Sequence, residues 1–192
     1  MKLLLTTTSP YCRKVRIVAA ERGIALEEHL SNPLEDPPEL RSASSIGKIP
    51  VLIGEDQTVY DSRVICEYLD EMAEGERLLP GGQQELWADR TRAALGDGIM
   101  DAALAMVMEG RRPAGERSPS WVERQAQRIM GIVRAAQPGD GTLTLGDIAV
   151  ACGLSYLDFR LPEMDWRVEN EALASWHARV EERQSFRDCP LG

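Results

Sequence analysis

The chain has few of the residues from which metal centres and disulfide frameworks are built. Its 192 residues include only four cysteines and two histidines. The cysteines lie far apart without paired spacing, and neither histidine belongs to a metal-ligand pattern. We therefore expect free thiols, as in a reducing cytosol, and no metal site.

Long apolar segments and an excess of positive charge are also missing. The N-terminal apolar run Leu3–Leu5 is too short for a signal-peptide core, and no window of about 20 residues is apolar enough to span a bilayer. The formal net charge is −9, so the surface should repel phosphate backbones. These features predict a cytoplasmic protein with neither nucleic acid nor a membrane as a partner.

The first part of the chain, residues 1–74, alternates between strand and helix patterns. Short apolar runs and segments of helical spacing are separated by Gly, Pro and Asp. Their order is that of a βαβ unit, with a parallel strand pair and a right-handed crossover, followed by a ββα unit. The expected elements are a strand at Lys2–Thr6, a helix at Pro10–Arg22, a strand at Ala25–Leu30, a short helix around Pro38–Ser42, strands at Val51–Ile53 and Thr58–Tyr60, and a helix at Ser62–Met72.

Strand patterns disappear beyond a linker rich in Gly and Glu at residues 75–82. Residues 83–192 form a second domain, in which prolines lie between the helical patterns rather than inside them. Thr144 and Asp147 have the spacing of a capping box. The expected helices are Gln83–Arg111, Trp121–Ala136, Gly146–Phe159 and Ala172–Arg183. The predicted fold class is an α/β domain followed by an all-α domain.

The junction between the first strand and the first helix carries the strongest chemical signal. Ser9 suits the N-cap position, and Pro10 suits the first helical position because it has no N–H to lose. The free backbone N–H groups of such a helix start favour an anion, including a thiolate. Ser9-Pro10-Tyr11-Cys12 resembles the thioredoxin-like active-site turn, with serine in place of the first cysteine of C-x-x-C.

Four motifs follow one another over nearly the whole chain. They are Ser9-Pro10-Tyr11-Cys12-Arg13-Lys14-Val15-Arg16, Gly47-Lys48-Ile49-Pro50-Val51-Leu52, Asp61-Ser62-Arg63-Val64-Ile65-Cys66-Glu67-Tyr68-Leu69 and Thr144-Leu145-Gly146-Asp147. In this order and spacing they resemble the motifs of the glutathione S-transferase family. Asp97–Ala102 and Tyr156–Arg160 resemble a bacterial branch with serine at the active-site turn. The resemblance implies an N-terminal thioredoxin-like domain, a C-terminal helical bundle, a homodimer, and glutathione as co-substrate with no other cofactor.

Two residues of the turn compete for the catalytic role that the resemblance implies. The hydroxyl of Ser9 would donate a hydrogen bond to the glutathione sulfur, whereas a simple N-cap serine contributes about 1 kcal/mol to folding. These two roles can coexist. Cys12 takes the place of the second cysteine of C-x-x-C, where the side chain is usually less exposed, so a structural thiol is the favoured interpretation. A reactive Cys12 would instead make the protein a thiol-disulfide reductase.

The resemblance also implies a set of glutathione-binding residues. The backbone of Ile49, before an expected cis bond to Pro50, would pair with the cysteinyl part, and Lys48 would meet the glycyl carboxylate. Asp61 would hold the γ-glutamyl ammonium, and Ser62, at a helix N-terminus, its carboxylate. Each position has a plainer alternative: a strand entry at Ile49, a solvated Lys48, and a helix cap at Asp61 and Ser62.

The second substrate is expected in an apolar pocket between the domains. The residues expected to line it are Tyr11, Met100, Ala103, Met106 and Val107. A methionine stripe at helical spacing is equally typical of an ordinary core, and this alternative stays open.

The resemblance therefore predicts a glutathione S-transferase that conjugates glutathione to a small electrophile in detoxification. Asp97 or Asp101 would reach across the dimer interface to the neighbour's glutathione, unless these carboxylates serve helix packing or solvation. Two alternatives remain. One is a glutathione-dependent thiol-disulfide reductase that uses Cys12, and the other is a non-catalytic binding or regulatory protein of the same fold.

Overall fold

The computed structural model describes residues 1–192, and the chain divides into two compact units. The first comprises Met1–Gly81 together with the C-terminal segment Gln184–Gly192, and the second comprises Gly82–Arg183. None of the helices combines the length and apolar character needed to cross a membrane. The first unit is a thioredoxin-like α/β fold and the second is all-helical, which confirms the predicted fold class.

The first unit is built on a four-stranded mixed sheet in the order β2-β1-β3-β4. β1 and β2 are parallel, as the βαβ pattern predicts, and both β1–β3 and β3–β4 are antiparallel. The strands are β1 (Lys2–Leu5), β2 (Glu27–Leu30), β3 (Val51–Ile53) and β4 (Thr58–Val59). β1, β2 and β4 are shorter than predicted, but every predicted strand is present.

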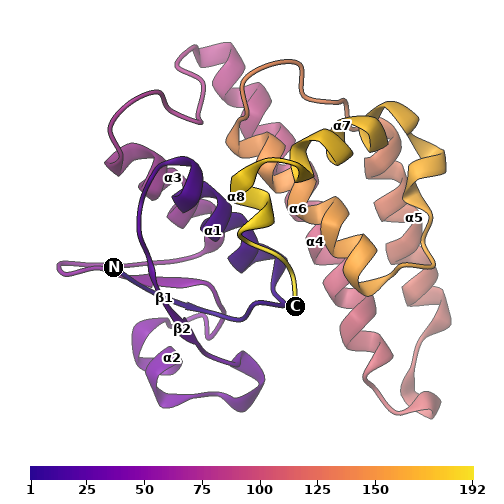
Figure 1. Ribbon diagram of the computed structural model, residues 1–192. Coiled ribbons are helices and arrows are strands. Elements are labelled where there is room, and N and C mark those ends of the chain that lie inside the picture. Colours follow the sequence, from indigo (N-terminus) through magenta and orange to yellow (C-terminus); the bar gives the residue numbers. More distant parts are fainter. The chain divides into compact units, whose positions relative to one another are not determined.

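Helices cover both faces of this sheet (Figure 1). The helices of the first unit are α1 (Pro10–Glu21), α2 (Pro38–Ala43), α3 (Ser62–Met72) and the short α8 (Gln184–Arg187), with a 3-10 turn at Pro33–Glu35. α1 and α3 pack on each other over one face, and α2 packs against β3 on the other. α8 packs against α1, so the C-terminal segment lies beside the helix that begins at Ser9.

The side chains of β1 alternate between the two faces of the sheet, and helices cover both faces. Leu4 packs with Leu40 of α2 and Val51 of β3 in one apolar cluster. Because successive strand residues point to opposite faces, Leu3 and Leu5 face the α1–α3 side. All three leucines are fully buried. The run of three leucines thus belongs to a strand covered on both faces.

The buried face of α3 differs from the predicted one. The helical spacing of the sequence predicts one apolar face made of Val64, Ile65, Tyr68, Leu69 and Met72, but Val64 and Met72 are 53% and 51% exposed. Ile65 and Leu69 are fully buried as predicted, and Asp70 is buried beside them. The side chain of Asp70 accepts backbone hydrogen bonds from the linker, so a carboxylate replaces an apolar residue on this face.

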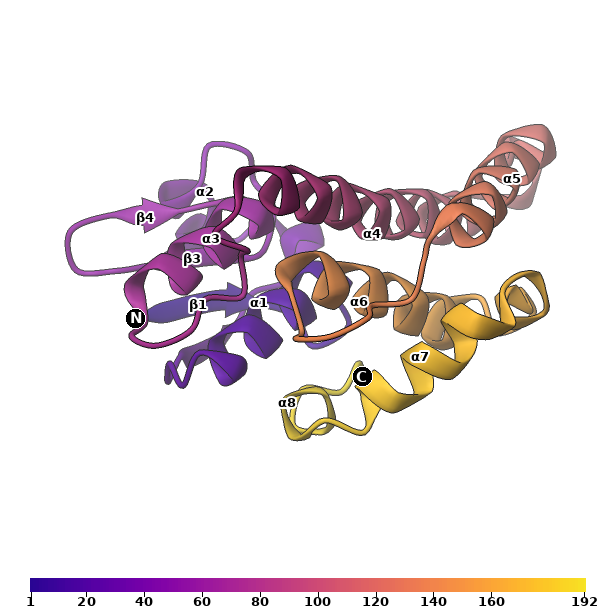
Figure 2. The ribbon, with the colours of Figure 1, turned by 90° about the horizontal axis from the view of Figure 1, so that it is seen from above.

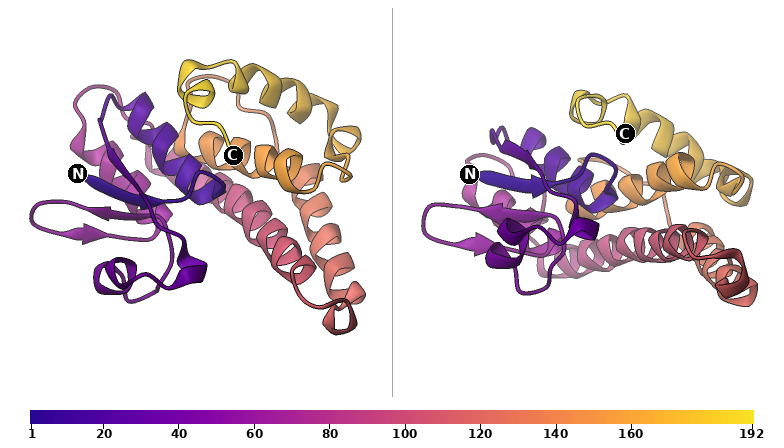
Figure 3. Two further views of the ribbon diagram at one scale, coloured as in Figure 1. Left: turned by 60° about the horizontal axis from the view of Figure 1, so that its bottom comes forward. Right: turned by 90° about the horizontal axis from the view of Figure 1, so that it is seen from below.

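The second unit is a helical bundle in which α4 is the longest element (Figure 2). α4 and α5 form a hairpin, α4 packs along α6, and α7 lies beside α6 (Figures 2 and 3). Its helices are α4 (Gln83–Gly110), α5 (Pro119–Ala135), α6 (Leu145–Arg160) and α7 (Glu171–Glu181), with 3-10 turns at Ala114–Glu116 and Trp166–Glu169.

Small residues let α4 and α6 approach closely. A Cβ at Gly96 of α4 would lie 2.2 Å from the Ala149 carbonyl carbon of α6, so only glycine is tolerated there. The predicted capping box at the start of α6 is confirmed. Thr144 Oγ1 accepts from Asp147 N at 3.2 Å, and the Asp147 side chain accepts from Thr144 N.

The two helices run in the same direction. Gly146, at the start of α6, lies against Asp89 near the start of α4. Further along, Gly153 of α6 lies against Ile99 of α4. The contacting residues thus increase in number along both helices together, so the two helices are parallel and end on the same side of the bundle.

Candidate functional site

The strand register brings the predicted glutathione-binding segments to one edge of the sheet. Leu4, near the end of β1, pairs with Val51, the first residue of β3, in an antiparallel register. β4 is antiparallel to β3, so the end of β4 and the start of α3 lie at this same edge. The segments that contain Ser9, Ile49 and Asp61 therefore meet there.

Ser9 is the N-cap of α1, as predicted. Its Oγ accepts a hydrogen bond from Cys12 N at 3.3 Å, and Pro10 occupies the first helical position. The Ser9 side chain keeps part of its surface exposed. The first turn contains no acidic residue, and the buried cations Arg13 and Lys14 follow it. The start of α1 therefore combines a hydroxyl with free N–H groups, and these together favour an anion.

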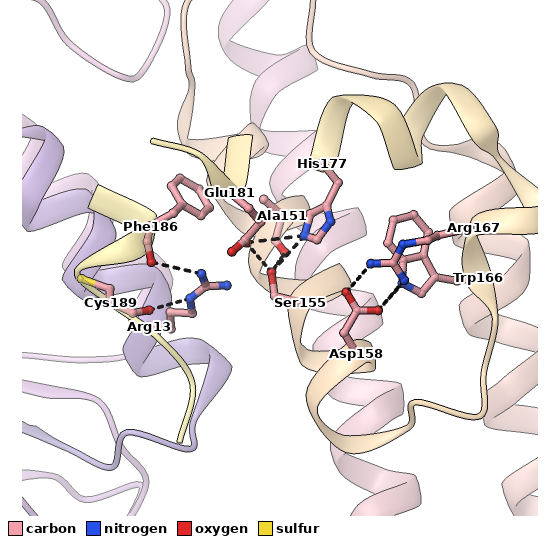
Figure 4. Close-up of polar contacts among 10 residues, drawn as sticks. All are labelled: Arg13, Ala151, Ser155, Asp158, Trp166, Arg167, His177, Glu181, Phe186 and Cys189. Atoms are coloured by element: carbon pink, nitrogen blue, oxygen red, sulfur yellow. Dashed lines mark hydrogen bonds and ion pairs between the residues drawn. The ribbon is translucent and has the colours of Figure 1, made fainter. Parts of the chain in front are cut away.

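The C-terminal segment fixes one of these cations. Arg13 is 3% exposed, and its Nε donates to the Cys189 carbonyl at 2.7 Å (Figure 4). Its guanidinium also lies 5.4 Å from the centre of the Phe186 ring. At the end of the segment, Gly192 N donates to the Thr7 carbonyl at 3.4 Å. No local sequence pattern indicated this arrangement, because it joins residues at opposite ends of the chain.

Cys12 lies one turn inside α1 with no exposed surface. Burial raises the pKa of its thiol to about 11, although the hydrogen bond with Ser9 works in the opposite direction. A thiol with this pKa is protonated at neutral pH and is a poor nucleophile. The geometry favours a structural role for Cys12. The other three cysteines are also free and buried.

The segment before β3 has the predicted backbone. The Ile49–Pro50 peptide bond is cis, and Ile49 is half-buried. Lys48 is exposed. Ser45 Oγ and the Tyr60 hydroxyl lie 3.2 Å apart and connect this loop with the start of α3.

The start of α3 offers both signs of charge. Asp61 is the N-cap, and its Oδ1 accepts from Arg63 N at 3.0 Å. Its carboxylate is exposed, whereas Ser62, the first helical residue, is 3% exposed. A carboxylate next to free helical N–H groups suits a zwitterion, with the ammonium at Asp61 and the carboxylate at the helix start.

The residues predicted for the second substrate differ in exposure. Met100 and Ala103 of α4 are fully buried, whereas Met106, Val107 and Tyr11 keep part of their surface. Only the latter three are accessible to a ligand without repacking. The two acidic residues predicted to reach across a dimer also differ, because Asp97 is 1% exposed and Asp101 is exposed.

A serine, a histidine and a glutamate meet between α6 and α7 and were not singled out from the sequence. Ser155 Oγ lies 3.0 Å from His177 Nε2 and donates to Glu181 Oε1 at 2.6 Å (Figure 4). The Glu181 carboxylate lies 3.5 Å from the same Nε2. In a catalytic triad the carboxylate instead contacts Nδ1, while the serine contacts Nε2. His177 is 4% exposed. This network joins two helices rather than forming a nucleophile.

Comparison with known proteins places both parts of the chain in one family. Residues 3–77 match the model of the glutathione S-transferase N-terminal domain, and residues 92–179 match that of the C-terminal domain. The chain is 34% identical over 194 residues to the uncharacterised GST-like protein YibF of Escherichia coli (strain K12). The aligned region covers 97% of this chain and 96% of that protein.

Two further relatives extend over most of the chain. A crystal structure of a glutathione S-transferase from Methylobacillus flagellatus KT with GSH bound has a TM-score of 0.93 and 40% identity, covering 100% of this chain and 99% of that one. A stringent starvation protein A homolog of Coxiella burnetii is 28% identical over 187 residues, covering 92% of this chain and 85% of that protein. The chain belongs to the glutathione S-transferase family.

Proposed function

We propose that the protein is a glutathione transferase that activates the thiol of glutathione at Ser9 for attack on a small electrophile. The observation that carries the proposal is the start of α1, where a partly exposed serine hydroxyl caps a turn without acidic residues. A thiolate placed there would meet one hydroxyl donor and the free N–H groups of the helix start.

Contacts of this kind have the magnitude that the chemistry requires. A thiol with a pKa of about 8.5 is roughly 3% ionised at pH 7, and a fall of about two units makes it roughly three-quarters thiolate. That fall corresponds to about 2.7 kcal/mol. A hydrogen bond to a charged group contributes about 1.5–3 kcal/mol and a helix N-terminus about 0.3–1 kcal/mol. Catalysis needs no covalent enzyme intermediate.

The rest of glutathione would bind along the same sheet edge. In this proposal Asp61 and the start of α3 take the γ-glutamyl group, the Ile49 backbone takes the cysteinyl part, and Lys48 takes the glycyl carboxylate. The glutathione-bound relative from Methylobacillus flagellatus supports the choice of ligand.

Calorimetry with glutathione, followed by conjugation of 1-chloro-2,4-dinitrobenzene, tests the proposal. We expect saturable binding of glutathione and chloride release that depends on both substrates. Binding without conjugation of any electrophile would overturn the transferase activity, and the absence of binding would overturn the site as well.

A non-catalytic role is the second candidate, and the name of the Coxiella relative, a stringent starvation protein A homolog, does not mention a transferase. This candidate predicts that neither binding heat nor thermal protection follows the addition of glutathione. The reductase alternative is disfavoured by the buried Cys12 thiol. It predicts reduction of a glutathione mixed disulfide that is lost in Cys12→Ser and retained in Ser9→Ala.

The proposal includes a cytoplasmic homodimer that serves detoxification. If a carboxylate crosses the dimer interface, exposed Asp101 is the better candidate than buried Asp97. Light scattering gives the mass in solution, and a monomeric mass at the concentrations used for kinetics would exclude the dimer.

A further inference from the structure

The C-terminal segment Gln184–Gly192 runs antiparallel along α1 and contacts both ends of that helix. Near the start of the segment, Ser185 Oγ donates to the side chain of Glu21, the last residue of α1. At its other end, Gly192 N donates to the carbonyl of Thr7, which lies before the helix begins. The segment therefore reaches from the last turn of α1 back to the loop that leads into its N-cap.

Arg13 links this segment to the start of α1. Its backbone N–H donates to the Ser9 carbonyl at 3.0 Å and so closes the first turn of the helix. Its side chain contacts the segment, since Nε donates to the Cys189 carbonyl at 2.7 Å and Nη2 to the Phe186 carbonyl at 3.4 Å (Figure 4). The guanidinium also lies 5.4 Å from the centre of the Phe186 ring. The main chain of Arg13 is thus bonded to Ser9, and its side chain to the C-terminal segment.

These contacts of Arg13 with Phe186 and Cys189, the Arg13 clamp, are buried. Arg13 is 3% exposed, Phe186 1% and Cys189 6%. A buried guanidinium is costly unless acceptors satisfy its N–H groups, and hydrogen bonds from a charged donor are about twice as strong as neutral ones. The acceptors are main-chain carbonyls, so these bonds place no carboxylate near the start of α1. The clamp can therefore be firm without repelling an anion bound there.

The loop between β1 and α1 is the part of the candidate site that these contacts support. The threonines at positions 6–8 are partly exposed, so packing holds the loop less firmly than the core. Within the loop, Ser9 N donates to the Thr6 carbonyl at 3.2 Å. The contacts of Arg13 and Gly192 with the C-terminal segment lie on either side of Ser9 in sequence. A catalytic hydroxyl has to be held within about 0.5 Å of its working position, and support from both sides meets that need.

We propose that the Arg13 clamp positions the Ser9 hydroxyl so that it donates to the glutathione sulfur. In this account Arg13 is a positioning residue, which touches no substrate and acts only through Ser9. The inference rests on the proposed transferase function and extends it to the residues that support the site. A simpler explanation is that Arg13 only fastens the C-terminal segment to α1. That explanation predicts a loss of stability without any change in the chemistry of the bound thiol.

Titration of bound glutathione in Arg13→Met tests the proposal. Methionine keeps an unbranched apolar stem and loses every donor. The pKa of the bound thiol, read from the ultraviolet absorbance of the thiolate, should rise by about 0.5–1 unit because the hydroxyl is less well placed. At a pH below the thiol pKa of both complexes, kcat should fall roughly three- to tenfold, and at a pH above both it should change little. A merely structural role would lower kcat by the same factor at every pH.

A double-mutant cycle shows whether Arg13 acts through Ser9. The double variant Ser9→Ala/Arg13→Met should have the same thiol pKa as Ser9→Ala alone, because a hydroxyl that is absent cannot be misplaced. If the rises of the two single variants added up instead, Arg13 would act on the thiolate by its own charge, and the positioning role would be wrong. At about pH 5.5, where the bound thiol is mainly protonated, the Kd of glutathione should change by less than about twofold in Arg13→Met.

Ser185→Ala is the matched control, because it also removes a hydrogen bond between the C-terminal segment and α1, but at the end of the helix away from Ser9. It should leave the thiol pKa within about 0.2 unit of the wild type. A rise as large as that of Arg13→Met would contradict the specific role of Arg13.

Arg13→Lys keeps the charge but loses the planar fork that reaches both carbonyls, so it should give about half of the rise. Melting temperatures show which variants are folded. If Arg13→Met does not fold, Arg13→Lys carries the test, and a wild-type thiol pKa in Arg13→Lys would then overturn the proposal.

The outcomes distinguish failure of this inference from failure of the proposed function. If Ser9→Ala raises the thiol pKa and folded Arg13→Met does not, the inference fails while activation by Ser9 stands. If Ser9→Ala leaves the thiol pKa unchanged, or if glutathione does not bind, the proposed function fails and the positioning role fails with it. A rise in both single variants, without a further rise in the double variant, would support the positioning role.

Discussion

The helices α1 and α3 begin with the same local geometry and opposite electrostatics. In each, an extended N-cap residue accepts a hydrogen bond from the backbone of its own first turn: Ser9 from Cys12 N and Asp61 from Arg63 N. The cap of α1 is neutral and buried cations follow it, whereas the cap of α3 is an exposed carboxylate. Capping requires only a side-chain oxygen, which both serine and aspartate provide. The charge of the cap residue can therefore be matched to a ligand without loss of the cap.

The contrast explains how one sheet edge would bind a tripeptide with several charges. In the proposed site, a neutral cap would leave the positive end of the α1 dipole available to a developing thiolate. An anionic cap at α3 would hold an ammonium while the N–H groups beside it hold a carboxylate. Exchanging the two caps should therefore change ligand chemistry while preserving the helices.

The largest effect is expected from Ser9→Asp. Aspartate caps a helix about as well as serine, so the melting temperature should change little. Its carboxylate would repel a thiolate about 4 Å away by about 4 kcal/mol at a surface-like dielectric constant, so kcat/KM should fall at least about 100-fold. Steady-state conjugation and thermal unfolding measure the two effects. A variant that kept its activity would show that no thiolate forms beside this cap.

The reverse exchange, Asp61→Ser, should weaken glutathione binding. Loss of the charged partner of the γ-glutamyl ammonium should raise Kd roughly 10- to 100-fold, because hydrogen bonds to charged groups contribute about 1.5–3 kcal/mol. Calorimetry measures Kd, and Asp56→Ser, which changes an exposed acid of the β3–β4 hairpin, is the control. A glutathione analogue without the γ-glutamyl amine should bind wild type and Asp61→Ser with the same Kd. If the analogue bound the wild type more tightly than Asp61→Ser, the assignment of Asp61 to the ammonium would be wrong.

A smaller effect is expected from Cys12→Ala. The buried thiol has a pKa of about 11, so its removal should change kcat/KM for conjugation by less than about twofold. In the wild type, alkylation of Cys12 by iodoacetamide at pH 7 should be slow compared with that of free glutathione. Rapid labelling at Cys12, read by mass spectrometry, would restore the reductase alternative.

The smallest effect is expected from an ion pair distant from both caps. The hydrogen bond and charge of Lys2 lower the pKa of Glu39 from its usual value of 4.5. Because the folded-state pKa is lower than the unfolded one, the stabilisation is present above about pH 4.5 and is lost as the pH falls through the folded value. The melting-temperature difference between wild type and Glu39→Gln should therefore be slight at pH 7 and should vanish in acid. If the melting-temperature difference between wild type and Glu39→Gln grew as the pH fell, the pKa of Glu39 would not be lowered by folding.

The parts predicted from sequence are those determined by neighbouring residues. The caps at Ser9 and Asp61 and the capping box of Thr144 each depend on residues within one helical turn, and all three are present. The cis bond before Pro50 and the parallel β1–β2 pair were also predicted correctly.

The parts that were missed depend on distant residues. Arg13 is held by the Cys189 carbonyl, and Ser155 meets His177 on another helix. The exposed Val64 has an apolar pattern but lies outside the narrow buried face of α3.

Titration of the bound thiol tests the central claim most directly. The ultraviolet absorbance of the thiolate, followed against pH in the glutathione complexes of wild type and Ser9→Ala, gives the thiol pKa in each. We expect a wild-type pKa about two units below that of free glutathione and an increase of about one unit or more in Ser9→Ala. Equal pKa values in the two complexes would contradict activation by Ser9.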